Sequence, residues 1–104
     1  MDSNFHIAPQ DMPVTVRWLN PIGCPTFDEP IAHLLHSIKQ PSTQVEVVSF
    51  DMPHSPTHLE YRAYEALTYE RTVRIARDCA RGGVDALVLG CFYAPALEDA
   101  REIY

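Results

Sequence analysis

The stretch that decides the fold is DALVLGCFYAPALEDA, residues 85–100, near the end of the chain. Its apolar run at residues 87–89 is typical of a strand that is buried on both faces of a parallel sheet. Gly90 and Cys91 end this run. A proline then stands where the first turn of a helix tolerates one, so we predict a helix over residues 95–104. The stretch therefore predicts a strand, a loop that begins with a thiol, and a helix.

The residues before this stretch repeat the same alternation of strand and helix. A helical pattern over residues 59–81 ends at two glycines, as helices commonly do. β-Branched and aromatic residues predict two further strands, over residues 14–20 and 45–50. Between them, Asp28 and Glu29 suit the first turn of a helix. The predicted apolar faces consist of Ile31, Leu34, Leu35 and Ile38 on the first helix, and of Tyr61, Tyr64, Leu67, Val73, Ala76, Cys79 and Ala80 on the second.

This order predicts an α/β protein with three layers, βαβαβα, around a short parallel sheet with right-handed crossovers. Residues 14–104 are expected to form a single α/β lobe. Residues 1–13 contain two prolines and no periodicity, so we expect an extended N-terminal arm. Ligands of such sheets bind outside the carboxyl ends of the strands. Three loops converge at that edge, residues 20–30, 51–58 and 90–95.

Composition and charge restrict the class of protein. The 104 residues are 46% hydrophobic, which is ordinary for one globular domain. No apolar stretch approaches the ~20 residues of a membrane helix, and the first residues lack the features of a signal peptide, so a cytoplasmic location is expected. A formal net charge of −6 argues against a nucleic acid or a membrane as partner. The three cysteines have no framework spacing and are predicted to be thiols.

Cys91 is the residue whose position most strongly indicates chemistry. A thiol near the N-terminus of a helix lies beside unpaired N–H groups and the positive end of the helix dipole. Both lower the pKa of a thiol. Its thiolate can act as a nucleophile, a base or a redox centre. The alternative is that Cys91 only fills space at the end of a buried strand.

The other cysteines and the histidines carry weaker indications. Cys24 lies in a ligand-side loop, so a disulfide or a second thiol near Cys91 remains open. His33 and His36 are three residues apart on a predicted helix, but the chain lacks the paired spacing of zinc ligands, and we expect no metal. Cys79 falls on an apolar helix face and is predicted to be a core residue.

Three segments resemble the aspartate/glutamate/hydantoin racemase superfamily, and its hydantoin-racemase branch in particular. They are LNPIG at residues 19–23, HLEYRAYEAL at 58–67 and GGVDALVLGCFYAPALEDAREI at 82–103. The resemblance runs over residues 14–103, and its strongest part is the segment around Cys91. Ala94 departs from the pattern, because many relatives carry aspartate there.

The resemblance implies a fold, a mechanism and a set of site residues. Members are built from two flavodoxin-like lobes that face each other across a cleft, and they use no metal and no cofactor. One cysteine takes a proton from a carbon next to a carbonyl, in a hydantoin or an acidic amino acid, and a second cysteine returns a proton to the opposite face. Cys91 would be one of these acid/base groups, and Asn20 would contact the polar groups of the substrate. The resemblance also assigns Pro21, Gly23, Cys24, Phe92 and Tyr93 to substrate binding.

The chain has about half the length of these enzymes, so we expect the second lobe to be absent from it. Three arrangements remain open. The chain is a piece of a longer enzyme, or two copies form a homodimer with a Cys91 from each across one cleft, which we favour among oligomeric states. In the third arrangement it is a non-catalytic module that binds a small acid or dimerises. A thiol-redox role ranks behind these.

Overall fold

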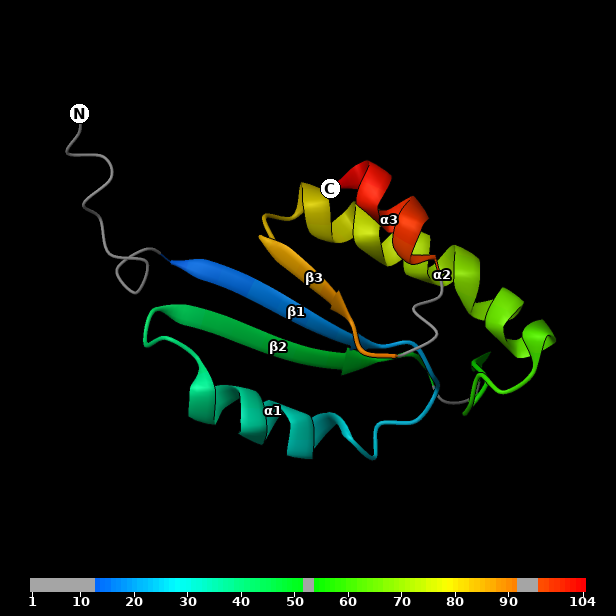
Figure 1. Ribbon diagram of the computed structural model, residues 1–104, viewed down its shortest axis with the longest axis horizontal. Coiled ribbons are helices and arrows are strands. Elements are labelled where there is room, and N and C mark those ends of the chain that lie inside the picture. The colour runs from blue at the N-terminus through cyan, green and yellow to red at the C-terminus, as the bar shows by residue number, and fades with distance from the viewer. Residues whose placement is uncertain (1–12, 52–53, 92–95) are drawn as a thin grey trace.

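A computed structural model describes residues 13–51, 54–91 and 96–104. The elements follow the order β1 (Val14–Asn20), α1 (Asp28–Ile38), β2 (Thr43–Ser49), α2 (Arg62–Arg81), β3 (Ala86–Leu89) and α3 (Leu97–Ile103). This order confirms the predicted alternation and the α/β class (Figure 1). The predicted N-terminal arm lies outside the described residues, apart from Pro13.

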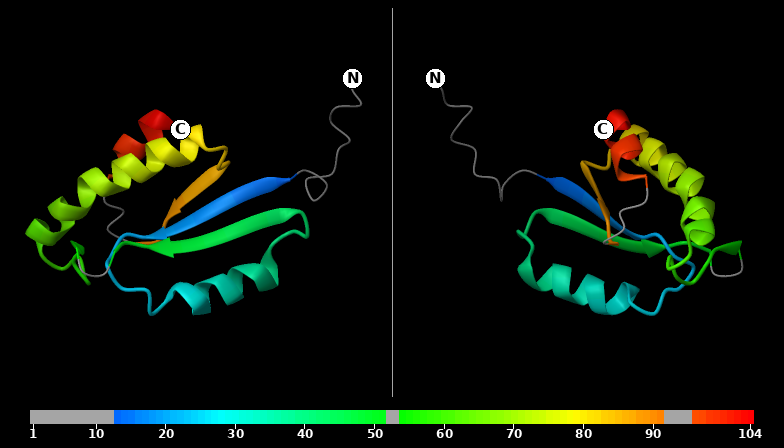
Figure 2. Two further views of the ribbon diagram at one scale, coloured as in Figure 1. Left: turned by 180° about the vertical axis from the view of Figure 1, so that it is seen from behind. Right: turned by 45° about the vertical axis from the view of Figure 1, so that its right-hand side comes forward.

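The three strands form one parallel sheet with β1 in the centre, in the order β2-β1-β3. Val16 of β1 aligns with Val45 of β2 and with Ala86 of β3. Helix α1 covers one face of the sheet, and α2 and α3 lie on the other, which gives three layers (Figures 1 and 2). Because the strands are parallel, their carboxyl ends meet at one edge and bring the following loops together.

The core is small and belongs mainly to the side of α2 and α3. Its buried hydrophobic residues are Leu19, Phe50, Leu59, Ala76, Cys79, Val84, Ala96 and Ala100. By contrast, α1, which the structure describes in full, has no buried residue. Leu34 and Ile38, predicted to be part of its inward face, are 58% and 70% exposed. The helical spacing correctly predicted α1, but part of its apolar face is not covered.

Helix α2 buries only part of the face predicted for it, together with two threonines that were not predicted. Its buried residues are Thr68, Thr72, Ala76 and Cys79, whereas Tyr61 and Leu67 are 60% and 63% exposed and Ala80 is exposed. The threonines tolerate burial because their hydroxyls donate to backbone carbonyls one turn earlier, at 2.7 Å for Thr68 and 2.9 Å for Thr72. The prediction was therefore wrong for three of the seven residues of this face, because it counted only apolar residues.

The prediction that β3 is buried on both faces is also wrong. Residues 87–89 are all partly exposed. Within the described sheet β3 is an edge strand, so it has a neighbouring strand, β1, on one side only. On the face of α1, Val88 lies in an open groove of about 360 Å³ that it shares with Val16, Trp18, Leu35, Ile38, Lys39, Gln40, Thr43 and Val45.

The last helix is shorter than predicted. It begins at Leu97, after Ala96, whose φ of 63° is left-handed. The predicted start at Pro95 lies outside the described residues. In the described part of the chain, no helix is both long and apolar enough to cross a membrane.

Candidate functional site

Cys91 stands at the carboxyl edge of the sheet, two residues after the end of β3, and lines an open pocket of about 410 Å³. The other described residues of its wall are Trp18, Leu89 and Gly90. Cys91 is partly exposed. The thiol therefore borders open space at the edge where parallel α/β sheets bind ligands.

Gly90 allows the Trp18 indole to form part of this wall. The Gly90 amide donates to the Leu19 carbonyl at 2.8 Å and so extends the pairing of β3 with β1. A Cβ atom at Gly90 would overlap the indole nitrogen and stand 2.6 Å from Cε2 of Trp18. A side chain and the indole cannot occupy this place together, so glycine is required at position 90 while the ring is present.

A series of hydrogen bonds that begins at the Trp18 indole fixes its position. Nε1 of Trp18 donates to Oδ1 of Asn20 at 2.8 Å, and Nδ2 of Asn20 donates to Oδ1 of Asp28 at 2.9 Å. Oδ2 of Asp28 accepts from the Ser49 hydroxyl at 3.0 Å. The series joins β1, the first residue of α1 and the last residue of β2. Asn20, predicted to contact substrate, is 6% exposed, and both ends of its amide have protein partners.

Pro21 and Gly23, predicted to bind substrate, hold the loops at this edge together. Pro21 is almost completely buried. The Gly23 amide donates to the Pro56 carbonyl at 2.7 Å, and a Cβ atom at Gly23 would stand 2.6 Å from the Ser55 carbonyl oxygen. The loop after β1 therefore packs against the loop after β2. Neither residue is among the described residues that line the Cys91 pocket.

Cys24 is a second, partly exposed thiol in the loop after β1. Its sulfur lies 3.1 Å from the Thr26 hydroxyl. The hydrogen bonds from the Thr26 side chain and backbone lower the pKa of Cys24. All three cysteines lie in the described part of the chain and are free thiols. Phe92 and Tyr93, also predicted to bind substrate, lie outside it.

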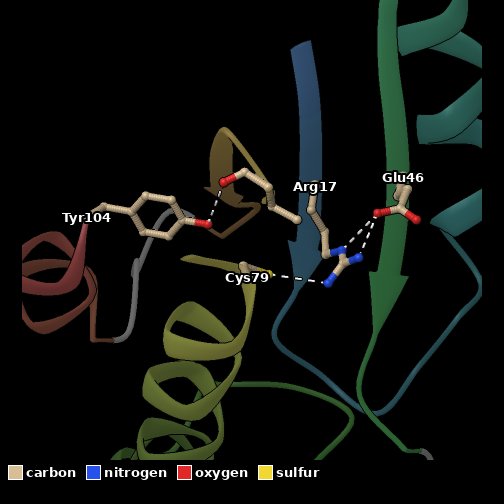
Figure 3. A network of polar contacts seen from close by, with 5 residues as sticks. Arg17, Glu46, Cys79 and Tyr104 are labelled. Carbon is tan, nitrogen blue, oxygen red and sulfur yellow. Dashed lines mark hydrogen bonds and ion pairs between the residues drawn. The ribbon is translucent and has the colours of Figure 1, made fainter. Parts of the chain in front are cut away.

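The opposite face of the sheet carries a polar network that the sequence analysis missed (Figure 3). Arg17 donates to the buried sulfur of Cys79 at 3.3 Å and to Oε1 of Glu46 at 2.7 and 3.0 Å. The bond to Glu46 raises the pKa of the Arg17 guanidinium. Tyr104 donates to the Val84 carbonyl at 3.3 Å, and burial raises the pKa of its hydroxyl. Cys79 is a core residue, as predicted, but it also accepts a charged donor.

Arg17 could have been found from the strand alternation. Arg17 is two residues before Leu19 on the same strand, so their side chains point to the same face of the sheet. Leu19 is fully buried, so the Arg17 side chain had to face the side of α2 and α3 as well.

Three aromatic rings gather where the loop after β2 enters α2. The ring centroids of His58, Tyr61 and Tyr64 are 5.0 to 5.3 Å apart. The three rings pack against one another, and this packing stabilises the start of α2. Across residues 13–51, 54–91 and 96–104, no group of three His, Cys, Asp or Glu side chains is arranged to hold a metal ion.

Fold and site together define a class: a parallel α/β protein with a thiol in an open pocket at the carboxyl edge of its sheet. Comparison with protein-family models, with curated proteins and with solved structures finds no match for this chain.

Proposed function

We propose that this protein is a cofactor-independent racemase or epimerase in which the Cys91 thiol exchanges a proton with a carbon next to a carbonyl. The substrate class is a hydantoin or an acidic amino acid. The observation that carries the proposal is the position of Cys91 in the wall of an open pocket at the ligand edge of the sheet. The resemblance of residues 82–103 to the cysteine segment of such racemases supports it.

The chemistry needs one base for exchange and two acid/base groups for inversion. The Cys91 thiolate takes the proton from the carbon, an S–H bond forms, and the C–H electron pair moves into the carbonyl to give an enolate. Backbone N–H groups at strand ends are suited to stabilise that charge. If the same thiol returns the proton, the hydrogen exchanges with solvent but the configuration is kept. Inversion requires a second acid on the opposite face.

A second copy of the chain is our proposed source of that acid. A twofold homodimer presents the same residue from each copy, so two Cys91 thiols can face one cleft. The exposed groove on the side of α1 favours this arrangement, because Trp18 lines both that groove and the Cys91 pocket. A copy seated in the groove would therefore lie next to the thiol.

Hydrogen exchange in deuterium oxide tests the function directly. The readout is deuterium at the α-carbon of a 5-substituted hydantoin and of glutamate, followed by proton nuclear magnetic resonance. We expect Cys91→Ser to slow the exchange by about a hundredfold or more, the usual contribution of general acid–base catalysis. Cys24→Ser should leave the exchange unchanged, because Cys24, although predicted to bind substrate, is not among the described residues that line the Cys91 pocket.

The outcomes separate the proposal from its alternatives. Exchange with inversion supports the two-thiol homodimer, and exchange with retention supports a single thiol. Equal exchange in Cys91→Ser and in the unmodified protein would remove Cys91 from the mechanism. Ligand binding at the pocket without any exchange would favour the alternative function, a non-catalytic module that binds a small acid or dimerises.

A further inference from the structure

We infer that Trp18 is the ligand-selecting wall of the Cys91 pocket and that Asn20 is a positioning residue that holds its indole in place. The inference rests on the proposed function in taking this pocket as the substrate site. It changes the role expected for Asn20, from a substrate contact to an indirect one. The group that such a wall would take is an apolar, preferably planar, substituent beside the reacting carbon.

Asn20 is committed to the protein rather than to a ligand. It is 6% exposed, its Oδ1 accepts from the indole, and its Nδ2 donates to Asp28. Asp28 in turn accepts from Ser49 on the neighbouring strand. Because Asn20 is buried, a substrate could reach the rest of its amide only by displacing the residues that cover it, which is unfavourable.

The orientation of Trp18 follows from the strand and from the glycine opposite. Trp18 and Asn20 are two residues apart on β1, so their side chains leave the same face of the sheet. The bond between them draws the indole toward the carboxyl edge, over Gly90, where a Cβ atom would overlap it. Asn20, Trp18 and Gly90 together place an aromatic ring beside Cys91.

The wall so formed is apolar in the part of the pocket that the structure describes. Its members are the Trp18 ring, Leu89, the Gly90 backbone and the thiol, and none of these carries a fixed charge. The indole N–H is already bonded to Asn20, which leaves the ring for ligand contact. Indole rings attract planar apolar groups by stacking and by burial of area. A carboxylate substituent gains nothing comparable from this wall.

The experiment uses Trp18 as its own reporter, because it is the single tryptophan of the chain. Two probes, 5-benzylhydantoin and glutamate, are titrated against the unmodified protein and against Asn20→Ala, Trp18→Phe, Trp18→Ala and the exposed-amide control Gln44→Ala. Indole fluorescence reports binding where Trp18 is present. Protection of Cys91 from iodoacetamide, measured in a Cys24→Ser background, reports binding in every variant.

We expect Asn20→Ala to shift the indole emission to longer wavelength and to weaken 5-benzylhydantoin binding about tenfold, the size of one aromatic contact. Trp18→Ala should weaken it at least as much, Trp18→Phe should keep most of it, and Gln44→Ala should change neither signal. Ser49→Ala removes only the last hydrogen bond of the series, the one to Asp28, and should shift the emission in the same direction by less. If Asn20→Ala is not folded by circular dichroism, Ser49→Ala and the two Trp18 variants decide the question.

Unchanged emission in Asn20→Ala and Ser49→Ala would overturn the positioning role. Equal loss of glutamate and 5-benzylhydantoin binding in Trp18→Ala would overturn the selecting role, as would no loss of either. These readouts need no proton transfer. Failure of the exchange experiment with the Trp18 effects intact would therefore count against the proposed function alone.

Discussion

Thr26 lowers the pKa of the Cys24 thiol through its hydroxyl, 3.1 Å from the sulfur, and through its backbone. The hydrogen bond stabilises the thiolate and so lowers the pKa of Cys24. Thr26→Val removes the hydroxyl, the larger of the two contributions, and the pKa of Cys24 should rise. In a Cys91→Ser background, the rate of Cys24 alkylation by iodoacetamide should therefore reach its half-maximum at a higher pH in Thr26→Val. Thr26→Ser keeps the hydroxyl and is the control; superimposed profiles for the valine and serine variants would contradict the assignment.

At the scale of single residues, the sequence predicted where a residue lies in the fold better than it predicted the hydrogen-bond partners of that residue. The end of an apolar strand was enough to place Cys91 at the edge of the sheet, because parallel strands share one carboxyl edge. The bond between Asn20 and Asp28 was not predictable, because it depends on how α1 enters beside β1. The position of the Trp18 ring depends in turn on Asn20 and on the missing side chain at Gly90.

At the scale of elements, the contact between Trp18 and Gly90 joins the end of β3 to β1 and can be measured as a coupling. Gly90→Ala should lower the free energy of unfolding by about 1–3 kcal/mol, because the added methyl overlaps a packed ring. In a Trp18→Ala background the same change should cost less by about 0.5 kcal/mol or more, since the ring has gone and only Oδ1 of Asn20, 2.9 Å from the added Cβ atom, remains too close. Urea unfolding of the four proteins in the cycle gives both values.

Gly23→Ala provides the matched control for this cycle. Its added methyl would stand 2.6 Å from the Ser55 carbonyl, which is backbone and cannot be truncated. Its cost should therefore be the same with and without Trp18. A cost of Gly90→Ala that is equally independent of Trp18 would mean that the indole does not lie over Gly90.

The sequence predicted which elements form better than it predicted which face each element buries. The three strands and α1 could be predicted because β-branched runs and helical spacing are local signals. The buried face of α2 could not, because Thr68 and Thr72 satisfy their hydroxyls within the helix and then pack as apolar residues do. The exposure of β3 follows from the strand order, which places it at an edge, and no local pattern encodes that order.

At the scale of the whole molecule, one side of the sheet is much less covered than the other. The buried hydrophobic residues belong mainly to the side of α2 and α3, whereas α1 leaves Leu34 and Ile38 exposed. Ile38 lines the groove that contains Trp18. A domain of this size is stabilised by only about 5–15 kcal/mol, so burial of such a face contributes a large share of the free energy of unfolding. A second copy that covers the groove would therefore stabilise the fold and also supply the second thiol.

If two copies associate through this groove, stability must depend on protein concentration, because association stabilises the folded state by mass action. We expect the urea midpoint to rise with concentration, and sedimentation to give a dimer at micromolar concentration. Ile38→Glu, a charge at a position that is 70% exposed, should abolish both effects and the inversion of substrate, while exchange with retention persists. Leu67→Glu, at a similarly exposed position on α2, should abolish none of them. A monomer whose midpoint is independent of concentration would exclude the second copy as the source of the opposing acid, and inversion by that monomer would require a second acid within one chain.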